Sequence, residues 1–166
     1  IKVTINEYNK TVDQYADNLY RFFVKNIGDT EAAHDLVQDS FAKMWIKVRD
    51  VEFVKAKSYL FTVGYNTMID YIRSKKRRDA YLSNQNPEPY EEKDYDLKGM
   101  LDYALGKLPE NQKTVILLRD YEGYSYEEIE QITGLSASQV KVYLFRARKS
   151  MKDRLIENRN LFPINV

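Results

Sequence analysis

The chain contains no cysteine among its 166 residues, and only six glycines and four prolines. Without cysteine there is no disulfide framework, no thiolate metal site and no cysteine nucleophile, which favours a reducing compartment. No run approaches the roughly 18 apolar residues that indicate a transmembrane helix. The first residues also lack the basic-then-apolar order of a signal peptide, so we expect a cytoplasmic protein without membrane insertion.

Charge is separated along the chain, although the formal net charge is only +1. Residues 73–78 read Arg-Ser-Lys-Lys-Arg-Arg, and residues 136–160 hold seven Lys or Arg against two acids. Residues 85–96, in contrast, hold five acids and one Lys. Two basic segments on either side of an acidic one indicate a polyanion contacted at two places. An ordinary solvated surface is the alternative for each segment.

Apolar residues at steps of three and four predict helices in the first half of the chain. Gly28 is expected to end the first helix, and Asp29 to cap a second that runs to about Arg49. After a short aperiodic connection, Ser58 is expected to cap a third helix that continues into the basic cluster at 73–78.

One face of this third helix combines Asn66, Asp70 and Arg73, which follow one another at spacings of four and three. The nearby aromatic residues are Tyr59, Phe61 and Tyr65. Such a face can hold a nucleic-acid single strand by stacking and phosphate contact. A core role for the aromatic side chains is the alternative, because aromatics at helical spacing are usually buried.

The polar stretch 79–99 predicts a flexible, acidic linker. We therefore expect an all-α fold of two small helical domains, residues 1–78 and 100–160. Fully extended, the linker spans about 65 Å, and two turns of DNA measure about 70 Å. Counting the width of the domains themselves, one chain can therefore reach two sites about that far apart on a duplex.

The second domain is expected to hold a helix-turn-helix. Ser125 to Glu128 and Ser136 to Gln139 each match a capping box, and Gly134 lies between them in the turn. Helical phase predicts a buried stripe in the last helix, made of Val140, Leu144, Ala147, Met151 and Leu155.

The opposite face of the last helix is expected to enter the major groove, where Arg and Lys donate to guanine and apolar groups meet the thymine methyl. The candidate residues are Ser138, Gln139, Lys141, Val142, Phe145, Arg146, Arg148 and Lys149. The alternative is a plain charged face with Phe145 packed against a neighbour.

Three motifs, in order along nearly the whole chain, resemble the extracytoplasmic-function sigma factors of bacteria. They are Asp35–Phe41 with Trp45, Tyr59–Asn66 with Asp70–Arg73, and Leu108–Glu110 with Gly123–Ile129 and Val140–Arg148. The sequence departs from the family at Gly64-Tyr65, where Ala-Arg is common. This departure puts one phosphate contact in question.

The resemblance implies a factor that binds core RNA polymerase and promoter DNA, recognises the minus-thirty-five and minus-ten elements and starts DNA melting. It implies that an acidic patch docks on the clamp coiled coil of the largest polymerase subunit, and this patch consists of Asp35, Gln38 and Asp39. An ordinary solvated helix face is the alternative for this patch. The loop from about Val48 to Lys57 would hold a flipped minus-ten base. The minus-ten residues would be Asn66, Arg73, Lys75, Lys76, Arg77 and Arg78. An anti-sigma factor is an expected partner, and no cofactor or metal is expected.

Two other functions compete with this interpretation. A stand-alone helix-turn-helix regulator would read a palindromic operator without polymerase. An enzyme is the second rival, but the only histidine, His34, has no cysteine, Gly-rich phosphate loop or spaced metal ligand to act with, so we expect no enzymatic activity.

Overall fold

The computed structural model describes residues 3–82 and 96–161, with side chains as far as Glu157. Its regular secondary structure is helical, which confirms the all-α prediction. Within the described ranges, no helix is both long enough and apolar enough to cross a membrane.

The first two helices begin and end where local chemistry predicts. Helix α1 (Ile5–Ile27) ends at Gly28, whose φ of 70° is left-handed and therefore suits glycine. Helix α2 (Thr30–Ile46) begins at Asp29, whose side chain accepts a hydrogen bond from the Ala32 N–H. Both caps confirm the sequence prediction. Helix α2 ends three residues before the predicted Arg49, where a 3-10 turn (Val48–Asp50) takes over.

Helix α3 (Ala56–Tyr81) starts two residues before Ser58, so the predicted cap is wrong. The chain enters α3 directly from a second 3-10 turn (Phe53–Lys55), and no side chain caps the helix. The basic cluster at 73–78 lies entirely within α3. Helix α3 also occupies the start of the segment 79–99 expected as a linker, and α4 (Leu97–Gly106) occupies its end. Residues 83–95 lie outside the described residues.

Residues 3–82 form the first half of the described chain, and residues 96–161 form the second half, which holds helices α4 to α7. Helix α5 (Glu110–Ile116) continues as a π-helical segment (Leu117–Tyr121), and α6 (Tyr126–Thr133) and α7 (Ala137–Leu161) follow. Pro109, predicted in the first turn of α5, stands at the cap position just before it. There, its missing N–H costs no helical hydrogen bond.

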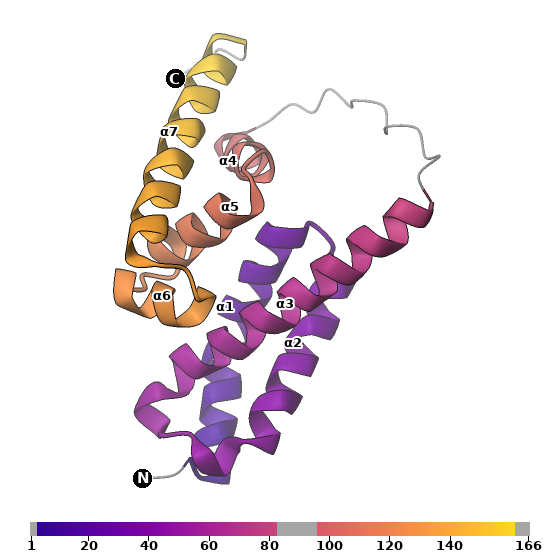
Figure 1. Cartoon of the computed structure of the whole chain (residues 1–166), viewed down its shortest axis with the longest axis vertical. Coiled ribbons are helices and arrows are strands. Elements are labelled where there is room, and N and C mark those ends of the chain that lie inside the picture. The colour runs from indigo at the N-terminus through magenta and orange to yellow at the C-terminus, as the bar shows by residue number, and fades with distance from the viewer. Residues whose placement is uncertain (1–2, 83–95, 162–166) are drawn as a thin grey trace.

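The two halves pack against each other around α3 (Figure 1). Helix α6 contacts α3, while α4 and α5 contact α1. Most buried apolar side chains of both halves form one continuous core, and Val3, Val48 and Val51 form a small second cluster. At the junction, the Phe61 ring packs edge-on between Phe22 and Tyr124, with centroid distances of 5.7 and 5.2 Å. All three side chains are almost fully buried, so this aromatic contact joins the halves.

Candidate nucleic-acid interface

Helices α6 and α7 form the helix-turn-helix. Ser125 and Glu128 make the predicted capping box at the start of α6. Gly134 ends α6 at a φ of 73° and donates its N–H to the Glu130 carbonyl. The left-handed backbone at Gly134 redirects the chain within a few residues, so that α7 can project away from α6.

Packing fixes which face of α7 is exposed. Val140, Leu144, Ala147 and Met151 are buried, and Leu155 is half-buried, as the helical phase predicts. The eight candidate groove residues are all exposed: Ser138, Gln139, Lys141, Val142, Phe145, Arg146, Arg148 and Lys149. The Phe145 side chain is 70% exposed, so the alternative in which it packs against a neighbour does not hold. An exposed phenyl ring among basic side chains suits apolar contact with a thymine methyl group.

Among the basic residues of α7 whose side chains the structure describes, Arg148 stands apart because an ion pair holds its guanidinium. Its Nε and Nη2 atoms donate to the Asp120 carboxylate over 3.0 and 2.6 Å. The hydrogen bond that Arg148 donates to Asp120 is the main reason why the Arg148 pKa is raised. The bidentate pair fixes the guanidinium in one orientation and leaves fewer of its donors for DNA.

The basic end of α3 forms a second exposed surface. Asn66 and Asp70 are exposed, and so is the whole cluster 73–78. Of this cluster, Lys76 reaches the second half, where its Nζ lies 3.1 Å from the Glu110 carboxylate. A shallow hollow lined by Asp70, Arg73, Ser74 and Arg77 lies on the same surface. Its arginines can hold phosphate groups at two successive turns of the helix.

The aromatic residues of α3 mostly belong to the core. Phe61 is fully buried, so the core role holds for this side chain and stacking on a single strand does not. Tyr59 and Tyr65 are half-buried. Burial, and secondarily the Glu110 carboxylate, raises the pKa of Tyr65. Both α1 and the second half cover this face of α3, because Phe61 packs between Phe22 and Tyr124.

The outward face of α2 holds Asp35, Gln38 and Asp39, and all three are exposed. Next to them, Val12, Phe41 and Trp45 help to line an apolar groove between α1 and α2. The sequence did not predict this groove. The Trp45 side chain, which helps to line it, is 45% exposed. His34 stacks on the Tyr20 ring at a centroid distance of 4.4 Å, so its side chain packs α2 against α1.

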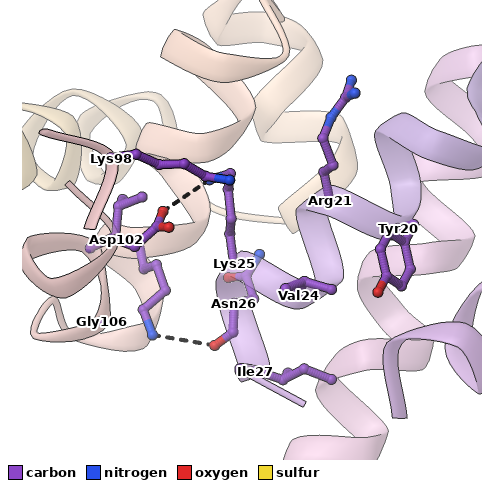
Figure 2. Close-up of a pocket in the computed structure, with 12 residues that line it drawn as sticks. Tyr20, Arg21, Val24, Lys25, Asn26, Ile27, Lys98, Asp102 and Gly106 are labelled. Atoms are coloured by element: carbon purple, nitrogen blue, oxygen red, sulfur yellow. Dashed lines mark hydrogen bonds and ion pairs between the residues drawn. The ribbon is translucent and has the colours of Figure 1, made fainter. Parts of the chain in front are cut away.

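A pocket that the sequence did not predict lies between the halves (Figure 2). Lys25 of α1 pairs with Asp102 of α4 at 3.1 Å. Lys113 donates to the Asn26 carbonyl over 3.2 Å, and the partial burial of its ammonium group lowers its pKa. Thr114 donates to the Asn26 side chain over 3.1 Å. These contacts hold the C-terminal end of α1 against α4 and α5.

Two stretches of the chain match sigma factor families. Residues 11–78 match the family described as Sigma-70 region 2, and residues 98–151 match Sigma-70, region 4. The RNA polymerase sigma factor SigV of Bacillus subtilis (strain 168) is 30% identical over 152 residues, covering 87% of this chain and 88% of that protein. The ECF RNA polymerase sigma factor SigM of the same organism is 29% identical and covers 86% of this chain and 93% of that protein. The chain is an extracytoplasmic-function sigma factor.

The structural comparison agrees with this assignment. The sigma factor RpoE, solved in complex with the anti-sigma factor NepR from Bartonella quintana, superposes with a TM-score of 0.78 at 25% identity. The match covers 91% of this chain and 98% of that one. This sigma factor therefore acts in transcription initiation, and a stand-alone operator-binding regulator is not favoured. It is a DNA-binding regulatory protein.

Proposed function

We propose that this sigma factor places two DNA-binding surfaces on one promoter while a third surface docks on polymerase. Residues 1–78 bind core polymerase and the minus-ten element, and residues 100–160 bind the minus-thirty-five element. The segment 79–99 joins these two parts and passes through the polymerase toward the RNA exit path. The observation that supports it is the arrangement of charge: basic surfaces on α3 and α7, and an acidic face on α2 that points to a different partner. The protein acts in the cytoplasm, without enzymatic activity and without a cofactor.

The surface of α7 reads the minus-thirty-five duplex. Arg146 and Lys149 supply positive charge for bases and phosphates, and the exposed Val142 and Phe145 supply apolar contacts. Arg148, whose guanidinium is paired with Asp120, contacts a phosphate rather than a base edge.

The basic end of α3 holds the minus-ten region. Asn66, Arg73, Lys75, Lys76, Arg77 and Arg78 contact the strand as it melts. The loop from Val48 to Lys57 takes up a flipped base, which costs a few kcal/mol of unstacking that the loop must offset. Phe53 and Val54 of this loop are exposed, while the Val51 carbonyl accepts a hydrogen bond from the Val3 N–H at the base of the loop. The loop thus presents apolar side chains on an anchored backbone.

Two proteins are the proposed partners. Asp35, Gln38 and Asp39 of α2 dock on the clamp coiled coil of core RNA polymerase. An anti-sigma factor is the second partner, because the similar RpoE structure was solved with NepR bound.

The direct test is run-off transcription with purified core polymerase on a library of random promoters. We expect defined start sites, preceded by conserved minus-ten and minus-thirty-five positions, only when the chain is present. Binding to DNA alone, with no start site on any template, would contradict the proposal and favour an operator-binding regulator.

A further inference from the structure

Three helices in the described part of the chain begin with a capping box. In such a box, the N-cap hydroxyl accepts the N–H of the third helical residue, whose side chain accepts the N–H of the cap. The third residue is Glu7 in α1 and Glu128 in α6. In α7 it is Gln139, whose Oε1 accepts the Ser136 N–H over 2.9 Å, while the Gln139 N–H donates to Ser136 Oγ over 3.2 Å. Of the three boxes, only that of the DNA-facing helix uses a neutral amide.

The exchange of acid for amide has a direct chemical consequence. A glutamate at this position would cap α7 equally well but would present a second carboxylate oxygen, and a negative charge, to the phosphates of DNA. Glutamine gives the same oxygen to the cap and presents an Nε2 amino group instead. Gln139 is exposed, and within the described residues its amino group donates to no acceptor. The recognition helix therefore begins with an oriented donor.

We infer that Gln139 is a specificity-determining residue whose amide oxygen is held by the cap and whose amino group donates to a base edge in the minus-thirty-five duplex. The inference rests on the proposed role of α7. Glutamine usually recognises adenine with both amide atoms, the oxygen accepting from N6 and the nitrogen donating to N7. Here, the Ser136 N–H holds the oxygen and fixes the amide plane, which removes the two-atom contact.

A single donor has a different preference from a bidentate amide. Guanine, adenine and thymine each offer an acceptor in the major groove, whereas cytosine offers only its N4 donor. We therefore expect one position of the minus-thirty-five element to exclude cytosine on the contacted strand, without a special preference for adenine.

The test compares holoenzymes made with the full chain and three variants, on a promoter that the wild-type chain uses. Gln139→Glu keeps the cap and loses the donor, so its thermal unfolding midpoint should be unchanged or higher while promoter binding weakens about tenfold or more. Gln139→Met is neutral and lacks both the donor and the capping oxygen, so weaker binding by this variant excludes charge repulsion as the cause, and its base profile separates loss of the donor from loss of the cap. The matched control is Glu128→Gln, the reverse exchange in the box of α6, which should leave promoter binding unchanged.

Selection from a library randomised across the minus-thirty-five element completes the test. The wild-type chain should exclude cytosine at one position, and Gln139→Met should accept all four bases there. Unchanged binding by Gln139→Met overturns the inference. Weaker binding with an unchanged base profile also overturns it, because the donor would then contact a phosphate. If the wild-type chain directs no transcription at all, the proposed function itself fails, and the two failures are thus distinguishable.

Discussion

Gly64 is the position where a single missing side chain allows α3 to approach α1. A Cβ atom built on Gly64 lies 2.8 Å from Leu19 Cδ1 and 3.2 Å from Phe23 Cζ, and both of these side chains are fully buried. Neither neighbour can move far in a close-packed core. The departure from the family's common Ala-Arg pair at Gly64-Tyr65 therefore has a packing reason at its first residue.

Gly64→Ala should destabilise the fold. Overpacking costs about 1–3 kcal/mol, and the better helix propensity of alanine returns at most about 1 kcal/mol, so we expect a net loss in the free energy of unfolding, measured in urea. Gly106→Ala is the control, because nothing lies within 4 Å of a Cβ built there. A Gly64→Ala variant as stable as the wild-type chain would show that Leu19 repacks freely.

At the scale of the element, α2 has two different faces. Its buried face, with Leu36 and Met44, belongs to the core, while Asp35 and Asp39 point outward beside the apolar groove formed with α1. An acidic face next to exposed apolar surface suits a partner helix that carries both basic and apolar side chains. Because neither carboxylate takes part in the core, this face can change without loss of the fold.

Charge reversal should therefore separate docking from folding. We expect Asp35→Lys or Asp39→Lys to abolish co-purification with core polymerase, while helix content by circular dichroism stays unchanged. Asp17→Lys makes the same charge change on the exposed surface of α1 and should still co-purify. Retention of polymerase by both α2 variants would remove the docking assignment.

At the scale of the whole molecule, the two halves are in direct contact, whereas the proposed binding to two promoter elements requires them to lie far apart. The Lys76–Glu110 and Lys25–Asp102 pairs and the buried Phe61 ring join the halves directly. Promoter elements about two turns of DNA apart lie roughly 70 Å from each other. The closed contacts between the halves must therefore give way when both surfaces engage DNA. Partly exposed ion pairs of this kind oppose separation by only about 0–1 kcal/mol each.

Fluorescence energy transfer can follow this opening, because the chain has no native cysteine to interfere with labelling. Dyes on Asp79→Cys in α3 and Asn111→Cys in α5 should give high transfer in the free chain and low transfer in the promoter-bound holoenzyme. A control pair within the first half, Asp17→Cys with Lys47→Cys, should not change. Equal transfer by the first pair in an active promoter complex would contradict opening.

The amino-acid sequence by itself determined the helices and much of the recognition surface. Caps at Asp29 and Ser125, the glycine stops and the periodic apolar stripe of α7 act within a few residues, so local chemistry sets them and the sequence displays them. The start of α3 was missed because a 3-10 turn, rather than a cap, leads into it.

Only the tertiary structure decided how the halves meet. Two contacts show this: Phe61 packs on Tyr124, 63 residues further along the chain, and Lys76 pairs with Glu110, 34 residues further. Within the second half, Arg148 pairs with Asp120, 28 residues before it. Contacts across such separations depend on how whole helices pack, and helical periodicity reports only which face of each helix is apolar. For that reason the sequence indicated which side chains are candidates for DNA contact, and the packing revealed which of these candidates are exposed and which are paired or buried.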